Sequence, residues 1–202
     1  ADISAPLVAA ARERAEAEGL EAAAFVEADA QTFAFEAGAF DTAISRFGVM
    51  FFDDPPAAFA NIRRAMRPGG RLTFVAWRSP AENPFMTAAG RAAAHLLPPQ
   101  PPPDPEAPGQ FAFADEGRVR RILEAAGWRD IDLQPLDLPT DVAEADLMAY
   151  VTRLGPVGLA LRAADEATRA QVTAVLKEAF APSVQDGAAR FTLACWLATA
   201  RA

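Results

Sequence analysis

Two apolar segments, FDTAISRF at 40–47 and LTFVAW at 72–77, flank the helical pattern PPAAFANIRRAM at 55–66. A polar loop at 48–54 precedes that pattern, and Pro68-Gly69-Gly70 follows it. Both apolar segments are rich in β-branched and aromatic residues, which favour strands. Strand, helix and strand in this order predict a βαβ unit with parallel strands and a right-handed crossover.

The carboxyl end of the first strand is the predicted mouth of a binding site. Ligands of open parallel sheets bind beyond the carboxyl ends of the strands. We therefore expect Ser45, Arg46 and Phe47 to border a ligand.

The rest of the chain continues to alternate between helix and strand patterns. Helices are expected after Ser4, from about Pro84, from Asp115, and twice between 143 and 180 on either side of Pro156; strands are expected at 23–26, 128–138 and 190–199. The proline-rich run at 98–105 predicts an extended connector, because proline enters neither helix interiors nor central strands.

Composition limits the class of protein. The chain has 202 residues, 51% of them hydrophobic and 23% charged, which is typical of a globular protein. A net charge of -8 argues against a nucleic-acid or anionic-membrane surface and favours small molecules or proteins as partners. The lone Cys195 lies in an apolar run and predicts a buried structural thiol in a reducing cytoplasm. No run approaches the ~20 apolar residues of a membrane span, and no signal peptide is recognisable.

Two acidic residues stand where they could hold a nucleoside. Asp2 precedes the first predicted helix and could accept hydrogen bonds from two vicinal ribose hydroxyls. Asp29 follows the strand predicted at 23–26 and could accept from an exocyclic amine, while the next backbone N–H donates to a ring nitrogen. The alternatives are an exposed terminal Asp for Asp2 and a turn-forming Asp for Asp29.

These elements and local motifs together resemble one family. Asp2-Ile3-Ser4 before a helix, Glu27-Ala28-Asp29-Ala30 after a strand, Phe40-Asp41 opening the next strand, and the run Arg64–Leu72 around Pro68-Gly69-Gly70 resemble class I S-adenosylmethionine-dependent methyltransferases, in particular ubiquinone and menaquinone methyltransferases. The resemblance implies a Rossmann-like, doubly wound, mostly parallel α/β sheet. It also implies an antiparallel C-terminal edge strand and a helical insertion.

The resemblance also implies roles for single residues. Asp2 would hold the ribose hydroxyls, and Ile3 would pack on adenine. Asp29 would accept from the adenine amine, and the Ala30 N–H would donate to a ring nitrogen. Ser45 and Arg46 would border the methionine part of the cofactor, chiefly through their backbone.

The chain departs from the family pattern at its start. The family's first strand and glycine-rich turn should precede Asp2, and nearly all of its second strand is also missing. We therefore expect the carboxyl-terminal part of a longer protein, or a truncated derivative, that binds the cofactor poorly or not at all as it stands. The expected organisation is a partial methyltransferase core at 1–138 and 189–202, with a helical insertion at 139–188 covering the substrate side.

Substrate and catalytic residues are less strongly indicated. Trp77 and Arg78, just past a strand end, are expected to touch substrate. The single histidine, His95, is a candidate general base, although a lone histidine is more often an ordinary helix residue. Phenylalanines could build a pocket for an aromatic or lipid-like acceptor, or could simply pack in core and loops: Phe51, Phe52, Phe85, Phe111 and Phe113.

The leading hypothesis is a cytoplasmic enzyme that transfers a methyl group from S-adenosylmethionine to a small apolar or aromatic acceptor, without a metal. One alternative is an NAD-dependent oxidoreductase, which would carry Gly-x-Gly-x-x-Gly ~20 residues before Asp2. Another is a non-catalytic remnant of the fold. We expect a small-molecule partner but no nucleic acid or membrane, and a homodimer stays open.

Overall fold

The computed structural model describes residues 1–99, 104–153 and 155–202. Most of the proline-rich connector predicted at 98–105, namely residues 100–103, lies outside the described residues. The chain divides into two compact units. Unit 1 comprises 1–76, 108–133 and 197–202, and unit 2 comprises 77–107 and 134–196.

The predicted βαβ unit is present in unit 1. Strand β1 (Phe40–Arg46) pairs in parallel with β2 (Met66–Trp77), and α2 (Pro55–Ala65) connects them. The strand predicted at 72–77 begins earlier, at Met66, so that Pro68-Gly69-Gly70 lies within β2. The register shifts there, because Phe40 pairs with Met66 whereas Thr42 already pairs with Arg71. A shift of this kind is a bulge, which accommodates proline and glycine inside a strand.

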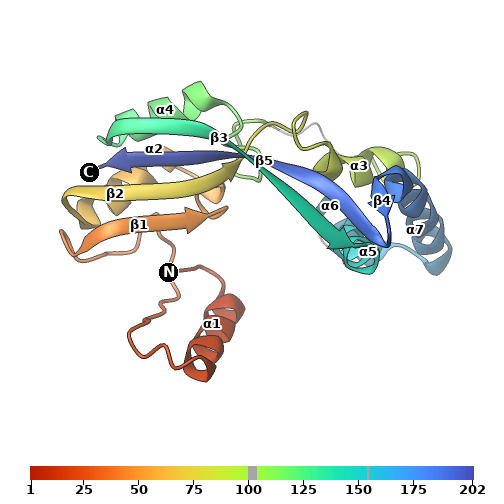
Figure 1. Ribbon diagram of the computed structural model, residues 1–202, viewed down its shortest axis with the longest axis horizontal. Coiled ribbons are helices and arrows are strands. Elements are labelled where there is room, and N and C mark those ends of the chain that lie inside the picture. The colour runs from red at the N-terminus through yellow and green to blue at the C-terminus, as the bar shows by residue number, and fades with distance from the viewer. Residues whose placement is uncertain (100–103, 154) are drawn as a thin grey trace. The chain divides into compact units, whose positions relative to one another are not determined.

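The sheet has the strand order β1-β2-β5-β3, where β3 is Arg129–Ala143 and β5 is Ala188–Arg201 (Figure 1). Strand β5 is antiparallel to β2. Gly70 pairs with Ala202 and Arg78 with Ala194, so the partner number falls by eight as the residue number rises by eight. The antiparallel direction is as expected, but the edge position is wrong, because β5 lies between β2 and β3. Adjacent Ala194 and Cys195 are both buried, so both faces of β5 are covered there, which explains its long apolar run.

Aromatic side chains form the core of unit 1. Phe59 of α2, Phe74 of β2 and Phe113 are almost completely buried, with ring centroids 5.6–6.1 Å apart. Helix α4 (Glu116–Ala125) packs beside α2, and the indole Nε1 of Trp128 donates to the Phe59 carbonyl at 3.1 Å. Phe113 is therefore a core residue and not part of a substrate pocket.

The amino-terminal part of unit 1 contains less regular structure than expected. Helix α1 (Ala5–Ala17) follows Ser4 and ends before Gly19, whose φ is 68°, as predicted. The strand predicted at 23–26 is absent. Only Glu27 forms a single parallel bridge, with Asp2, so these residues lack the repeated pairing that makes a strand.

Unit 2 contains α3 (Pro84–Ala93), α5 (Glu144–Arg153), α6 (Gly155–Ala163) and α7 (Glu166–Phe180), which pack around a shared apolar cluster. The sequence patterns predicted two helices at 143–180, and the structure has three. The missed helix is α6. The sequence pattern predicts Pro156 between two helices, but Pro156 lies in the first turn of α6. A proline is tolerated there because its missing N–H would form no hydrogen bond within the helix.

Short elements complete both units. The 3-10 turns Val49–Phe51 and Ala181–Ser183 lie in units 1 and 2, respectively. In unit 2, β4 (Val184–Gln185) pairs antiparallel with β5 through Asp186 and Gly187, which both have positive φ. Two positive-φ residues in an Asp-Gly pair are typical of a tight hairpin turn.

Candidate functional site

A cavity of about 630 Å³ lies within unit 1, along β1 from Phe40 to Arg46 and the turn that follows it. Its volume is in the range of small-molecule sites. Its lining includes all six residues predicted to bind the cofactor: Asp2, Ile3, Asp29, Ala30, Ser45 and Arg46. Phe51 and Phe52, two of the predicted pocket phenylalanines, also line it. Three separate segments of the chain thus meet around one space.

Asp2 is held in place at the cavity by its backbone. Its N–H donates to the Val26 carbonyl at 3.1 Å, and its carbonyl accepts from the Ala28 N–H at 2.9 Å. One carboxylate oxygen, Oδ1, accepts from the Ser4 N–H at 2.8 Å. Within the described residues no donor reaches Oδ2, so this oxygen can still accept from a ligand. The neighbouring Ile3 is 73% exposed, an apolar surface beside a polar anchor.

Asp29 is bonded to a residue that the sequence analysis did not single out. Its Oδ1 accepts from the Gln31 backbone N–H at 2.9 Å, and its Oδ2 accepts from the Gln31 side-chain amide at 3.2 Å. The Gln31 Oε1 in turn accepts from the Asp53 N–H at 2.7 Å. Asp29 thus forms the turn that the alternative interpretation of this residue predicted. Each of its carboxylate oxygens still has a second lone pair that can accept a hydrogen bond. The sequence feature that could have predicted these bonds is a glutamine two residues after Asp29.

The loop that carries Ala30 is fastened to α2. The Asn61 side-chain amide donates to the carbonyls of Ala30 and Phe33, at 3.0 and 2.9 Å. The Asn61 Oδ1 accepts from Arg64 at 2.8 Å. No acceptor for the Ala30 N–H exists in the part of the chain that the structure describes, so this donor is available at the cavity wall.

The end of β1 has an unusual backbone conformation. Phe47 lines the cavity with a φ of 61°, the left-handed region that a bulky residue rarely adopts. Its N–H donates to the Val75 carbonyl at 3.0 Å, which fixes this turn. Such conformations persist only where surrounding contacts impose them, and they concentrate at functional sites. Neighbouring Arg46 forms no ion pair within the described residues.

Neither Phe111 nor Phe113 of unit 1 lines this cavity, and the remaining predicted residues, Trp77, Arg78, Phe85 and His95, belong to unit 2. Arg78 is engaged in a charged cluster. It donates to Glu82 at 2.6 Å and to Asp137 at 2.9 Å, and its guanidinium lies 5.6 Å from the centroid of the Trp196 ring. Trp77 contacts the Phe85 ring. Contact of Trp77 and Arg78 with substrate stays a prediction.

The same cluster shifts two pKa values. Hydrogen bonds from Ser79 and then Arg78 lower the pKa of Glu82 below its ordinary value. The bond to Glu82 is the main cause of a raised pKa for Arg78, although burial opposes it. Both groups are therefore held in their charged forms.

His95, the candidate base, is exposed in the turn after α3. It forms no hydrogen bond with another described residue, so no partner orients its ring for proton transfer. Over 1–99, 104–153 and 155–202 there is no group of three or more His, Cys, Asp and Glu side chains that could hold a metal ion. In the same ranges, none of the helices has the length and apolar character needed to cross a membrane.

Residues 1–74 match the family described as "Methyltransferase domain". Demethylmenaquinone methyltransferase from Thermus thermophilus is 41% identical over 85 residues, which cover 42% of this chain and 38% of the relative. The enzyme of that name from Corynebacterium kroppenstedtii is 31% identical over 114 residues, which cover 52% and 50%. The chain thus spans half or less of these relatives' length.

Solved structures show a similar fold. The YcgJ protein from Bacillus subtilis has a TM-score of 0.58 and 17% identity, with 98% of this chain and 79% of that chain covered. A protein from Bacillus halodurans C-125, provisionally assigned as a methyltransferase, has a TM-score of 0.60 and 17% identity, with 99% and 80% covered. Identities this low concern the fold alone.

The α/β sheet has the Rossmann-like fold of these solved structures. In the sequence of residues 1–74 and in its fold, the chain is similar to class I S-adenosylmethionine-dependent methyltransferases.

Proposed function

We propose that this chain is part of an enzyme that transfers a methyl group from S-adenosylmethionine to a small apolar or aromatic acceptor, in the cytoplasm. The observation that carries the proposal is the meeting of Asp2, Asp29 and Ser45 around one cavity of nucleoside-binding size. Asp2 and Asp29 lie within the sequence motifs that resemble the methyltransferase family, and Ser45 lies on the strand that the next motif opens.

The residues at the cavity fit the cofactor. The Asp2 Oδ2 and the Ala30 N–H are an acceptor and a donor without partners among the described residues. A ribose hydroxyl and an adenine ring nitrogen need such groups. Exposed Ile3 would pack on the adenine face, and Asp29 would accept from the adenine amine with its remaining lone pairs.

The chemistry places few demands on side chains. S-adenosylmethionine supplies an electrophilic methyl group, which the acceptor attacks in line with the departing sulfur. Positioning can therefore contribute much of the catalysis. The turn at Ser45, Arg46 and Phe47 would border the methionine end and fix that geometry through its backbone. A base such as His95 is needed only if the acceptor must lose a proton.

An apolar or aromatic acceptor is supported by two observations. Phe51 and Phe52 line the cavity, and Phe51 is 54% exposed. The two relatives named above are demethylmenaquinone methyltransferases, whose name denotes a quinone acceptor. We further propose that the helical segment 139–188 contributes to acceptor recognition.

Isothermal titration with S-adenosylhomocysteine tests the cofactor. The titration uses the chain as printed and a version extended upstream to its relatives' length. We expect clear binding by the longer version, about tenfold weakened or more by Asp2→Asn and by Asp29→Asn. Asp41→Asn is the matched control, because Asp41 lies on β1 outside the cavity and pairs with Arg67. The proposal fails if the longer version does not bind, or if all three variants bind equally well.

A further inference from the structure

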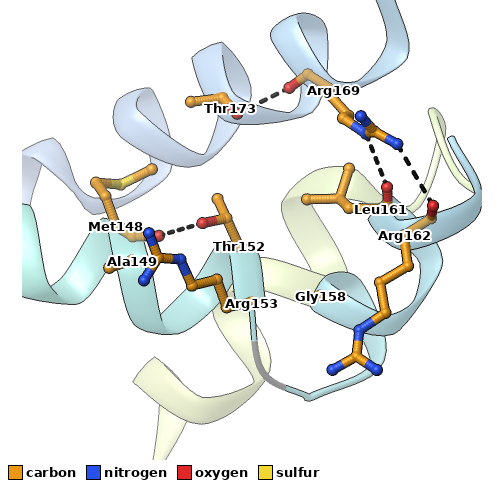
Figure 2. A pocket seen from close by; sticks show the side chains of 9 residues that line it. All are labelled: Met148, Ala149, Thr152, Arg153, Gly158, Leu161, Arg162, Arg169 and Thr173. Atoms are coloured by element: carbon orange, nitrogen blue, oxygen red, sulfur yellow. Dashed lines mark hydrogen bonds between the residues drawn. The ribbon is translucent and has the colours of Figure 1, made fainter. Parts of the chain in front are cut away.

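A second cavity, of about 580 Å³, lies entirely within unit 2, among α5, α6 and α7 (Figure 2). The cavity that we assign to the cofactor shares none of its lining residues. Leu161 of α6 is buried at its wall, and Met148 and Ala149 of α5 are half-buried there. One part of this cavity is therefore apolar.

The charged part of the lining is purely cationic. Arg153, Arg162 and Arg169 line the cavity, one from each helix. The segment 144–180 also contains five acidic residues, and none of them lines it. In a protein of net charge -8, three arginines without a carboxylate among them make a local positive field.

Two of these arginines have no protein acceptor. Arg169 donates to the carbonyls of Leu161 and Arg162, at 3.0 and 3.4 Å, and so forms hydrogen bonds with the last turn of α6. In Figure 2 no dashed line reaches the guanidinium of Arg153 or Arg162. Across the described part of the chain neither guanidinium forms a hydrogen bond or ion pair. Each therefore offers all five N–H donors.

The helices that carry these two arginines are held close together. Gly158 of α6 lines the cavity and faces the backbone of Arg153 at the end of α5. A Cβ at Gly158 would overlap the Arg153 carbonyl group, so only glycine permits this approach. Figure 2 shows the Arg153 and Arg162 side chains extending from these helices in different directions.

We propose that this cavity binds a small amphipathic anion, a carboxylate or phosphate group on a short apolar arm. Guanidinium forks pair with oxyanions of both kinds, often through two parallel hydrogen bonds. The apolar arm would lie against Met148 and Leu161. The proposal does not depend on methyl transfer, since it concerns a different cavity and is tested by binding alone.

Calorimetric titration of the chain with octanoate, octyl phosphate and neutral octanamide tests the proposal. We expect one site for at least one of the anions and about tenfold weaker binding of octanamide. Preference between the two anions identifies the headgroup. Absence of binding by both anions, or equal binding of octanamide, would overturn the proposal.

Arginine variants locate the site. Arg153→Gln with Arg162→Gln should weaken anion binding about tenfold or more, because the oxyanion loses its charged partners. Arg129→Gln removes the same kind of charge from an exposed position in unit 1 and should leave the affinity unchanged. Circular dichroism checks that each variant is folded. Equal affinities in all of these proteins would place the anion elsewhere and sink the assignment.

Discussion

The side chain of Asn83 forms two hydrogen bonds with the peptide groups of Ala194, 111 residues away in the sequence. Its amide donates to the Ala194 carbonyl, and its Oδ1 accepts from the Ala194 N–H, both at 2.9 Å. Asn83 is completely buried at the start of α3, and it also donates to the Ser79 carbonyl at 3.2 Å. One side chain thus joins α3 to strand β5 within unit 2.

Asn83→Ala should destabilise unit 2 by about 3 kcal/mol, because it leaves the buried N–H of Ala194 without its partner and removes one of the two hydrogen bonds to the Ala194 carbonyl. Urea unfolding followed by tryptophan fluorescence measures the loss, since Trp77 and Trp196 belong to this unit. Thr87→Ala is the control in the same helix. It removes two exposed hydrogen bonds, one to the Pro84 carbonyl and one from the Arg91 guanidinium, and should cost less than about 1 kcal/mol. Equal losses would mean that the Asn83 bonds contribute little.

Local patterns predicted a large part of this structure. The βαβ unit depends on apolar periodicity within about 40 residues, and Ser45 lines the cavity near the end of β1, where such folds bind ligands. Asp2 and Asp29 line the same cavity beside the single bridge between Asp2 and Glu27, because the strand predicted at 23–26 does not form. The predictions that failed concern contacts between residues far apart in the sequence. The place of β5 inside the sheet is set by β2 and β3, and no property of Asn83 itself points to Ala194. Helix α6 was missed because Pro156 permits either a break or a helix start.

Asn61→Ala should loosen the loop that carries Ala30. The Asn61 amide holds two carbonyls of this loop, at Ala30 and Phe33. Its removal should make the amides of Thr32 and Phe33, both bonded to the Asp29 carbonyl, exchange about tenfold faster. Hydrogen exchange read by NMR measures this.

The amide of Val119, bonded to the Asp115 carbonyl at the start of α4, is the internal reference for that experiment and should keep its rate. If the loop amides keep their rates as well, Asn61 does not anchor the loop.

The Cys195 thiol should make stability depend on alkaline pH. Burial raises its pKa to about 11, with an opposing effect from Arg78. In the unfolded chain the thiol ionises near pH ~8.5. The folded state gains relative stability below that pH, and the gain disappears as the pH rises through the folded pKa.

Comparing the unfolding free energies of the wild type and Cys195→Ala at about pH 7.5 and about pH 10 tests this. The wild type should lose more stability over that interval than the alanine variant. The same change in both proteins would exclude a contribution from the thiol.

Glu82 should make stability depend on pH in the acidic range, where stability falls as the pH decreases. Its pKa is lowered by hydrogen bonds from Ser79 and then Arg78, so its contribution is complete above the unfolded value. The contribution disappears as the pH falls through the lower, folded value. Glu82→Gln should therefore destabilise the protein at neutral pH, and this deficit should shrink in acid. Thermal unfolding across that range measures it, and a deficit independent of pH would rule the ion-pair cluster out as the cause.

Alanine substitutions at Gly127 and Gly90 should change the free energy of unfolding in opposite directions. Gly127 follows α4 with a φ of 85°, and a Cβ there would approach the Arg63 guanidinium to 3.3 Å. Gly127→Ala should cost about 1–2 kcal/mol, because an L-residue is strained in this conformation.

Gly90 lies inside α3, and a Cβ there would meet no atom within 4 Å. Gly90→Ala should stabilise the protein by up to about 1 kcal/mol, the difference in helix propensity between the two residues. Denaturant unfolding of both variants measures the two changes. The positive φ and the helical position are the features that distinguish these glycines. If both substitutions have the same sign, backbone conformation does not determine the response.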